Sequence, residues 1–396
     1  MVKEALLLPP SLLSPCDPVA TVPLNEQLAF PRWQQDIPGE YRGLDAPELI
    51  ERISVAKSKL AQRVVILGHH YQRDDVIRFA DQRGDSFKLA RWAAGNPQAE
   101  YIVFCGVHFM AESADILCAS HQKVVLPNMT AGCSMADMAS LDDVASCWDE
   151  LAGASLADDT LPVTYINSTA ALKAFCGRRG GVVCTSSNAA AVFRWALAQR
   201  RRILFFPDEH LGRVTGRALD VALAQMPVWR RALSKGSLGG NDYATLRDGS
   251  IILWNGYCGV HQRFTVDQVR RVRERYAGVR VVVHPECRLE VVEAADSVGS
   301  TEHIISVVGE SPSGSVWAIG TEINLVGRLG REHRDKAVLS LDPDPCPCST
   351  MYRIHPAYLC WVLERLVEGE VVNRVTVEPE TAHWAKLALE RMLAIA

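Results

Sequence analysis

Short apolar runs alternate with amphipathic stretches along most of the chain, beginning near residue 46. The apolar runs have the length and β-branched content of buried strands, and we expect strands at 64–67, 101–105, 124–126, 163–166, 181–184, 203–206, 251–253, 279–283, 316–319 and 338–341. The stretches between them have helical spacing, and we expect helices at 48–60, 76–94, 135–150, 170–175, 189–199 and 266–276. This alternation predicts an α/β fold with helices on both faces of small parallel sheets.

The order of these elements contains a coarse threefold repeat. Three strands run into polar turns, Gly68-His-His-Tyr71, Tyr165-Ile-Asn167 and His284-Pro-Glu286, and each opens a block that closes with a cysteine on a loop, Cys133, Cys258 or Cys348. We therefore predict three similar three-layer αβα domains around a pseudo-threefold axis. The expected bounds are 46–150, 151–265 with an insertion at 213–250, and 266–396 with C-terminal helices, after an N-terminal arm at 1–45.

Composition narrows the classes of function. Of the 396 residues, 48% are hydrophobic and 22% are charged, which is typical of a chain that buries packed cores. The formal net charge of -4 argues against a dedicated nucleic-acid binder. No apolar run approaches the roughly 18 residues of a membrane helix, and the first residues lack the features of a signal peptide. We expect a cytoplasmic protein without membrane or nucleic-acid partners, whose 12 cysteines are mostly thiols.

Three cysteines are candidate metal ligands. Ligands of parallel sheets collect at the carboxyl ends of the strands, where Cys133, Cys258 and Cys348 follow. Three thiolates without close pairing fit structural zinc poorly and suit an iron–sulfur cluster with one iron left open. Two other interpretations stay open. Unpaired cysteines are commonly buried bystanders, and Cys346 lies close enough to Cys348 for a redox disulfide.

Further polar groups follow the strands. Small hydroxyl residues precede three predicted helices, at 84–86, 185–188 and 299–301, and helix N-termini bind anions. Each alone is also an ordinary helix cap, but together they favour a ligand with several carboxylates or a phosphate. His69 and Tyr71 are candidates for proton transfer, and so are His284 and Glu286 on one face of an extended segment. A hydrogen-bonded structural histidine is the alternative.

The ordered motifs resemble the quinolinate synthases, the A-type [4Fe–4S] enzymes of de novo NAD (pyridine nucleotide) biosynthesis. The resemblance covers roughly residues 63–355 and includes Gly68-His-His-Tyr-Gln72, Gly132-Cys-Ser-Met135, Trp254-Asn-Gly-Tyr-Cys-Gly-Val-His261, His284-Pro-Glu-Cys287 and Cys348-Ser-Thr-Met351. So many motifs in one order make the resemblance specific. The insertion at 213–250 and the first 45 residues lie outside it.

The resemblance implies a cofactor, a reaction and a set of site residues. It implies a [4Fe–4S] cluster on Cys133, Cys258 and Cys348, whose open iron is a Lewis acid in dehydration. It also implies that iminoaspartate and dihydroxyacetone phosphate condense to quinolinate, phosphate and water, with the L-aspartate oxidase that supplies the imine as a partner. The implied catalytic residues are Tyr71, Tyr165, His284 and Glu286. The implied substrate-binding residues are His69, Ser86, Tyr165, Ile166, Asn167, Ser186, His284, Pro285, Glu286, Ser300 and Thr301.

Two other functions share part of this pattern. A different [4Fe–4S] hydro-lyase would have the cluster and the anion sites but would not consume a triose phosphate. A cluster-based redox sensor would use Cys346 and Cys348 as its switch. A sensor also needs a module for DNA or partner binding, and the sequence contains no basic recognition helix.

Overall fold

The computed structural model describes residues 21–26, 35–233 and 235–395. The predicted N-terminal arm at 1–45 therefore lies largely outside the described residues. Within it, the structure describes a 3-10 turn at Leu24–Glu26 and the short helix α1 (Gly39–Arg42).

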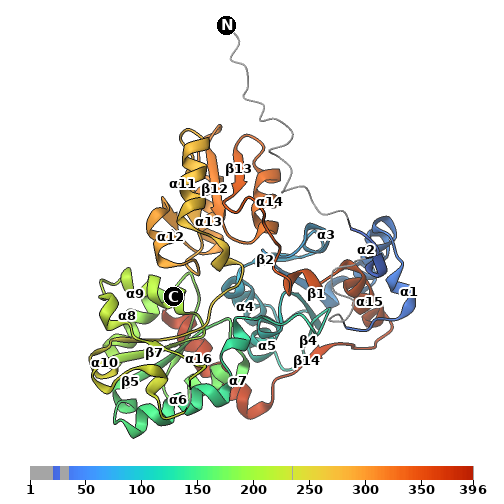
Figure 1. The fold of residues 1–396 in the computed structure, drawn as a ribbon. Coiled ribbons are helices and arrows are strands. Elements are labelled where there is room, and N and C mark those ends of the chain that lie inside the picture. Colours follow the sequence, from blue (N-terminus) through green and yellow to red (C-terminus); the bar gives the residue numbers. More distant parts are fainter. Residues whose placement is uncertain (1–20, 27–34, 234, 396) are drawn as a thin grey trace.

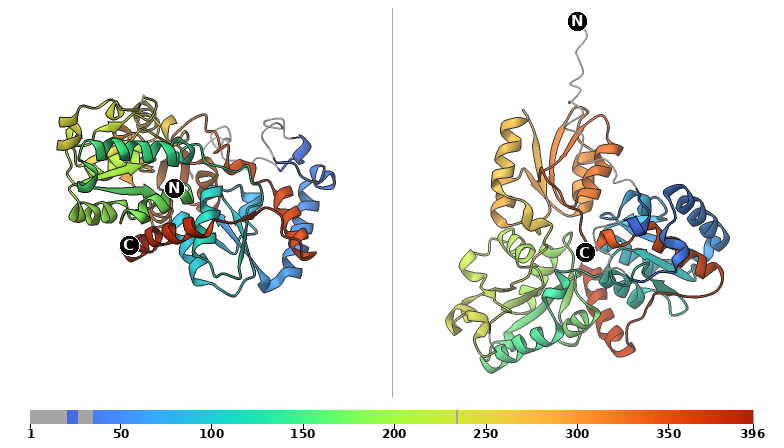
Figure 2. Two further views of the ribbon diagram at one scale, coloured as in Figure 1. Left: turned by 90° about the horizontal axis from the view of Figure 1, so that it is seen from below. Right: turned by 45° about the vertical axis from the view of Figure 1, so that its right-hand side comes forward.

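Three α/β units lie around a common centre (Figures 1 and 2). Their sheets have the strand orders β14-β4-β3-β1-β2, β6-β5-β7-β9-β8 and β11-β10-β12-β13. All strand pairs are parallel except β14 with β4. The predicted α/β class, with three small parallel sheets flanked by helices, is confirmed.

The first unit is built on β1, which is buried at every residue, as a strand covered on both faces requires. Its elements are α2 (Ala46–Leu60), β1 (Val64–His69), α3 (Asp74–Ile77), β2 (Gln82–Gly84), α4 (Ser86–Gly95), β3 (Tyr101–Cys105), α5 (His108–Leu117) and β4 (Lys123–Val125). The predicted continuous helix at 76–94 is wrong, because β2 divides it and pairs with β1. β2 is a polar Gln-Arg-Gly edge strand, so no apolar pattern marks it.

The second unit begins before the expected boundary at residue 150. Its elements are α6 (Leu141–Gly153), β5 (Thr160–Tyr165), α7 (Ala170–Arg178), β6 (Val182–Cys184), α8 (Ala189–Gln199), β7 (Arg202–Phe206), α9 (Glu209–Arg217), β8 (Val228–Trp229), α10 (Tyr243–Asp248) and β9 (Ile251–Trp254). α6 begins at Leu141 rather than 135, since Ser140 caps it by accepting the N–H of Asp143. The residues of 213–250 add β8 to the edge of this sheet.

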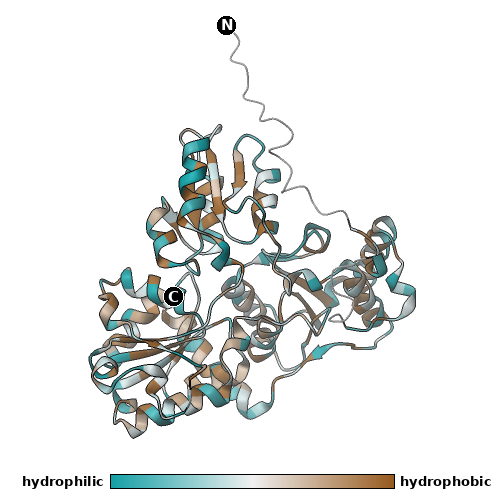
Figure 3. Ribbon diagram, viewed as in Figure 1, coloured by the Kyte–Doolittle hydropathy of each residue, from teal (hydrophilic) through white to brown (hydrophobic). Residues whose placement is uncertain are grey.

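The third unit holds the four-stranded sheet. Its elements are α11 (Val266–Arg275), β10 (Arg280–Val283), α12 (Leu289–Ala294), β11 (Ser297–Val298), α13 (Thr301–Gly309), β12 (Val316–Gly320), α14 (Ile323–Glu332) and β13 (Ala337–Ser340). Separate apolar clusters lie on the two faces of this sheet. Figure 3 shows its apolar strands inside and polar residues along α11 outside.

The C-terminal segment leaves the third unit, although the expected bounds of 266–396 included it there. α15 (Pro356–Val367) packs on α2, and β14 (Arg374–Val375) pairs with β4, both in the first unit. α16 (Pro379–Ile395) packs on α7 and adds Ala385, Leu389 and Met392 to the core of the second unit. These contacts tie the first two units together. Among the described residues, no helix combines the length and apolar character needed to cross a bilayer.

Candidate active site

One cavity lies where the loops at the carboxyl ends of the three sheets meet. The space within it, including the part that opens to solvent, is about 670 Å³. All three units contribute to the wall, because parallel strands direct their following loops to one edge. The sequence-predicted residues on the wall are His69, Tyr71, Ser86, Cys133, Tyr165, Ile166, Asn167, Ser186, Cys258, His284, Glu286, Thr301 and Cys348.

Two predicted residues do not line the cavity. Ser300 is the N-cap of α13, where its hydroxyl accepts the N–H of His303 at 3.4 Å. Pro285 lies between His284 and Glu286 in a turn, rather than in the extended segment that we expected, because the N–H of Cys287 donates to the carbonyl of His284 at 3.0 Å. Asp85 and Thr185 also line the wall and lie in the segments 84–86 and 185–188 that we expected to bind anions. The wall residues that the prediction missed are Val107, Phe109, Met110, Met135, Val260, His261, Thr350 and Met351.

The three wall cysteines come one from each unit, after β4, β9 and β13. Burial raises the pKa of the Cys133 thiol to about 12 and the pKa of Cys258 well above its ordinary value, and the charge of Cys348 raises both further. Burial likewise raises the pKa of Cys348. The three thiols therefore line one cavity in their protonated forms, and a bound cation there would favour their ionisation.

Backbone N–H groups approach each of these sulfur atoms. They belong to Ala136 and Met135 at Cys133, to His261 at Cys258, and to Met351 and Thr350 at Cys348. Such N–H groups stabilise the sulfur ligands of iron–sulfur clusters. Three converging thiols with N–H donors therefore fit a cluster with three protein ligands. Cys346 is exposed and lies outside the wall, and both Cys346 and Cys348 are free thiols.

His284 and Glu286 face His261 across the boundary between the second and third units. Glu286 Oε2 lies 2.8 Å from His261 Nδ1 and 3.9 Å from His284 Nδ1, and the two imidazole rings stack with centroids 4.6 Å apart. Burial lowers the pKa of His284 to about 3. Burial alone would raise the pKa of Glu286, but the neighbouring imidazoles and hydrogen bonds lower it. Near neutral pH the site thus pairs a neutral imidazole with a carboxylate.

Both wall tyrosines are held in the protonated form. Burial raises the pKa values of Tyr71 and Tyr165 well above the ordinary value, and the charge of Glu286 raises them further. Tyr71 Oη lies 2.7 Å from Thr321 Oγ1. His69, whose pKa burial lowers to about 3, accepts the N–H of Tyr71 at Nδ1. That bond leaves the ring proton of His69 on Nε2.

Ser86 and Thr301 begin α4 and α13, Ser186 lies in the turn that precedes α8, and all three residues line the cavity. Two wall atoms nearby, Thr301 Oγ1 and Asn167 Oδ1, are buried and make no hydrogen bond within the described part of the chain. Buried polar atoms are normally paired, so these two are available to a ligand. Helix N-termini attract negative charge. The cavity therefore suits a polar, anionic ligand.

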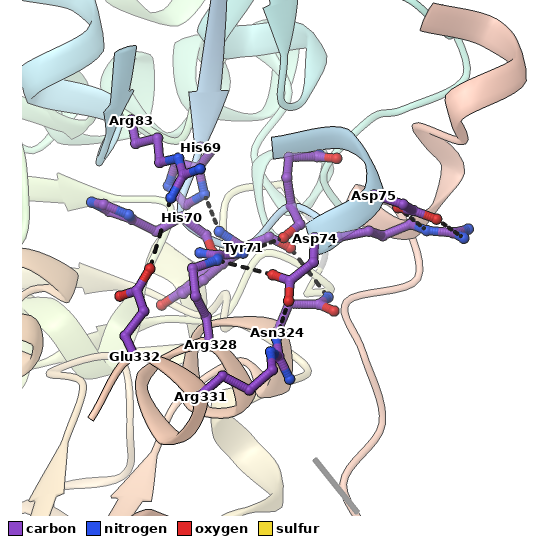
Figure 4. Close-up of polar contacts among 12 residues, drawn as sticks. His69, His70, Tyr71, Asp74, Asp75, Arg83, Asn324, Arg328, Arg331 and Glu332 are labelled. Atoms are coloured by element: carbon purple, nitrogen blue, oxygen red, sulfur yellow. Dashed lines mark hydrogen bonds and ion pairs between the residues drawn. The ribbon is translucent and has the colours of Figure 1, made fainter. Parts of the chain in front are cut away.

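A buried arginine of the third unit holds the loop that follows His69 and carries Tyr71. Arg328 of α14 donates to the carbonyl of His70 at 2.8 Å, to the carbonyl of Gln72 at 2.6 Å and to Asp74 at 3.0 Å. Figure 4 shows Arg328 and Arg331 side by side against Asp74. Nearby, Asn324 donates to the carbonyl of Tyr71 at 3.3 Å. These contacts fix one wall of the cavity from the neighbouring unit.

The chain is similar in sequence to known proteins. A sequence model of a protein family, described as Quinolinate synthetase A protein, matches residues 51–394. A Streptomyces coelicolor protein named quinolinate synthase is 54% identical over 383 residues, covering 96% of each chain. A Corynebacterium glutamicum protein of the same name is 53% identical over 362 residues, covering 91% of each chain. The quinolinate synthase of Acidobacterium capsulatum is 54% identical over 361 residues, covering 90% of this chain and 95% of its own.

Proposed function

The chain belongs to the quinolinate synthetase A family, and on this premise we propose that it condenses iminoaspartate with dihydroxyacetone phosphate to quinolinate, phosphate and water. It is an enzyme of NAD biosynthesis. The observation that carries the proposal is one cavity in which a cysteine from each unit lies with His284 and Glu286. The two alternatives considered from the sequence, another hydro-lyase and a redox sensor, are not favoured by the names of the relatives.

Cys133, Cys258 and Cys348 are the residues that would hold a [4Fe–4S] cluster. When bound, such a cluster supplies a Lewis-acid iron that can polarise a carboxylate or a departing hydroxyl. The chemistry of the donors supports this assignment, since a thiol from each unit lines one cavity and backbone N–H groups lie near each sulfur. Three protein ligands would leave one iron of such a cluster free to hold a substrate oxygen.

The substrates bring two carboxylates and one phosphate, and the wall offers three helix N-termini to receive them. Ser86, Ser186 and Thr301 would bind these anions through hydroxyl and backbone N–H groups, with Ser300 fixing the start of α13. Asn167 and His69 would orient the substrates by hydrogen bonds, Asn167 through its unpartnered Oδ1. Ile166 and Pro285 would shape the wall rather than bind polar groups.

Proton transfer would fall to Glu286, His284, Tyr71 and Tyr165. Glu286, held as a carboxylate, can accept a proton at Oε2. His284 accepts the N–H of Glu286 at Nδ1 over 3.4 Å, so its Nε2–H can donate. The two tyrosines keep their hydroxyl protons and can donate them to developing oxyanions. Tyr165, His284 and Glu286 are buried and Tyr71 is partly buried, which would help to keep water from the reactive imine.

The imine substrate requires a supplier. An oxidase that converts L-aspartate to the imine is the partner that fits this chemistry, and we place both reactions in the cytoplasm. The transfer of an unstable imine would favour close association of the two enzymes.

The test measures quinolinate formed by anaerobically purified protein from the two substrates. We expect product from the unmodified chain and a loss of most product in His284→Ala, with the iron content unchanged. Consumption of dihydroxyacetone phosphate must match quinolinate formed, since a simple hydro-lyase would not consume it. The proposal would be overturned by iron-loaded protein that forms no quinolinate, and so would equal activity in His284→Ala.

A further inference from the structure

Three metal-ligating atoms of different chemistry meet on the cavity wall. Cys258 and His261 follow β9 in the second unit, and Glu286 follows β10 in the third. Their sulfur, ring nitrogen and carboxylate oxygen atoms all lie within 4.8 Å of one another. The side chains of His261 and Glu286 are only 1% and 4% exposed. The proposed function uses Cys258 and Glu286 separately and assigns His261 no role.

The contacts of His261 leave its ring nitrogen Nδ1 facing the carboxylate of Glu286. Nε2 lies 3.1 Å from the hydroxyl of Thr321, which bonds Tyr71 in turn. Nδ1 lies 2.8 Å from Glu286 Oε2, yet it makes no hydrogen bond of good geometry. When Nε2–H donates to Thr321, Nδ1 and the carboxylate are two acceptors in close contact. Such a pair needs a cation between its atoms, either a proton or a metal ion.

This arrangement has the features of a mononuclear metal site. A metal-binding histidine normally donates its other ring N–H to an oxygen atom, as His261 can to Thr321. One thiolate, one imidazole and one carboxylate suit Zn²⁺ at bond lengths of about 2.0–2.3 Å, with a fourth position open. The three ligand atoms lie within 4.8 Å of one another, which lets them face a single ion.

We propose that Cys258, His261 and Glu286 form a mononuclear site that binds Zn²⁺ when no cluster occupies the cavity. The site and the cluster exclude each other, because Cys258 belongs to both. Zinc would therefore block cluster assembly and inactivate the enzyme. The inference goes beyond the proposed function and rests on it only in the shared use of Cys258.

Charge favours this set of ligands over three cysteines. A thiolate, a carboxylate and a neutral imidazole cancel the two charges of Zn²⁺, and the loaded site is neutral. Three thiolates would leave one net negative charge. The cavity wall is buried, and an uncompensated charge there is costly. The carboxylate of Glu286 next to a third thiolate would add to that cost.

The experiment uses the full chain, freed of iron by anaerobic chelation, with Zn²⁺ as the probe. Affinity is measured by competition with a chromophoric chelator, and X-ray absorption counts the sulfur atoms bound to zinc. We expect one zinc per chain with one sulfur ligand. His261→Ala should lower the affinity more than 100-fold, and Cys133→Ala, the matched control outside the site, should leave it unchanged.

Thr321→Val keeps all three ligands and provides a second test that does not depend on the folding of His261→Ala. Removing an outer-shell partner typically lowers metal affinity about 10- to 100-fold, and we expect that range here. Three sulfur ligands per zinc would overturn the inference, and so would an equal loss of affinity in Cys133→Ala or no zinc binding at all. None of these readouts uses catalytic activity, so failure here leaves the proposed function standing.

Discussion

Replacing Arg328 by alanine should displace a wall of the cavity without touching any residue that binds substrate or cluster. Arg328 is 6% exposed, and its guanidinium donates to the carbonyls of His70 and Gln72 as well as to Asp74. These bonds run from the third unit to the loop after β1 (Figure 4). That loop carries Tyr71 and follows directly on His69, so its position decides the shape of the substrate site.

The expected fall in kcat/KM of Arg328→Ala can be worked out from the hydrogen bonds that the substitution removes. A hydrogen bond to a charged donor is worth about 1.5–3 kcal/mol, and Arg328→Ala removes two such bonds to carbonyls together with an ion pair. The two carbonyl bonds alone amount to about 3–6 kcal/mol, and water that enters the space should offset part of this loss. Since about 1.4 kcal/mol corresponds to a tenfold change in an equilibrium, we expect kcat/KM to fall about 10- to 100-fold.

The assay compares KM, kcat and iron content of Arg328→Ala and Arg331→Ala. Arg331 lies on the same helix and pairs with the same Asp74, but the carbonyl bonds of Arg328 remain when it is replaced. We expect KM to carry most of the loss in Arg328→Ala, added guanidinium to restore part of it, and the iron content to stay unchanged. Equal effects in the two variants, or normal kinetics in Arg328→Ala, would refute the role of the carbonyl bonds.

Three further predictions concern other parts of the chain. Burial lowers the pKa of His355 to about 3, below an unfolded value of about 6.5, so its contribution to stability is present above about pH 6.5 and is lost as the pH falls toward 3. His355→Asn keeps a side-chain cap on α15 but removes the titrating imidazole. The unfolding free energy of the variant should therefore fall less steeply with acid than that of the unmodified chain, by up to about 1.4 kcal/mol per pH unit. Parallel curves of unfolding free energy against pH for the two proteins would contradict this. Gly256→Ala should lower the iron content per chain, since a Cβ at this position would lie 2.2 Å from the carbonyl oxygen of Pro207 and would displace the loop that carries Cys258. Full iron content in this variant would contradict the prediction. Lys173→Met should raise KM and leave the iron content intact, because the buried amine donates to the carbonyl of Ser168 beside Asn167; an unchanged KM would show that the loop holds without it.

Local pattern predicted most of the sheets, and long-range contact explains what it missed. The buried strand β1 and its neighbours are apolar runs covered on both faces, so their residues alone identify them. β2 and β14 are short, and they contain polar residues that carry no strand signal. The return of α16 to the second unit depends on packing against α7, which no spacing in the sequence encodes.

The site residues also separate into those that the sequence indicated and those that only the structure revealed. The cysteines and the polar turns stand at strand ends, where parallel sheets bring ligands together, so their order in the sequence indicated them. The choice of Cys348 over Cys346 and of the individual substrate-binding residues came from the family resemblance. His261 was missed although it lies three residues after Cys258 in a quoted motif, and that spacing was the available signal. Arg328 binds backbone carbonyls more than 250 residues away in sequence, and such a contact has no sequence pattern.

The most direct test of the central claim counts iron and acid-labile sulfide per chain in anaerobically prepared protein. The claim is that one cysteine from each unit holds the cluster. We expect about four irons and four sulfides in the unmodified chain, a loss of both in Cys133→Ser, Cys258→Ser and Cys348→Ser, and no change in the exposed neighbour variant Cys346→Ser. Iron retained in any of the three variants, or lost in Cys346→Ser alone, would contradict the account.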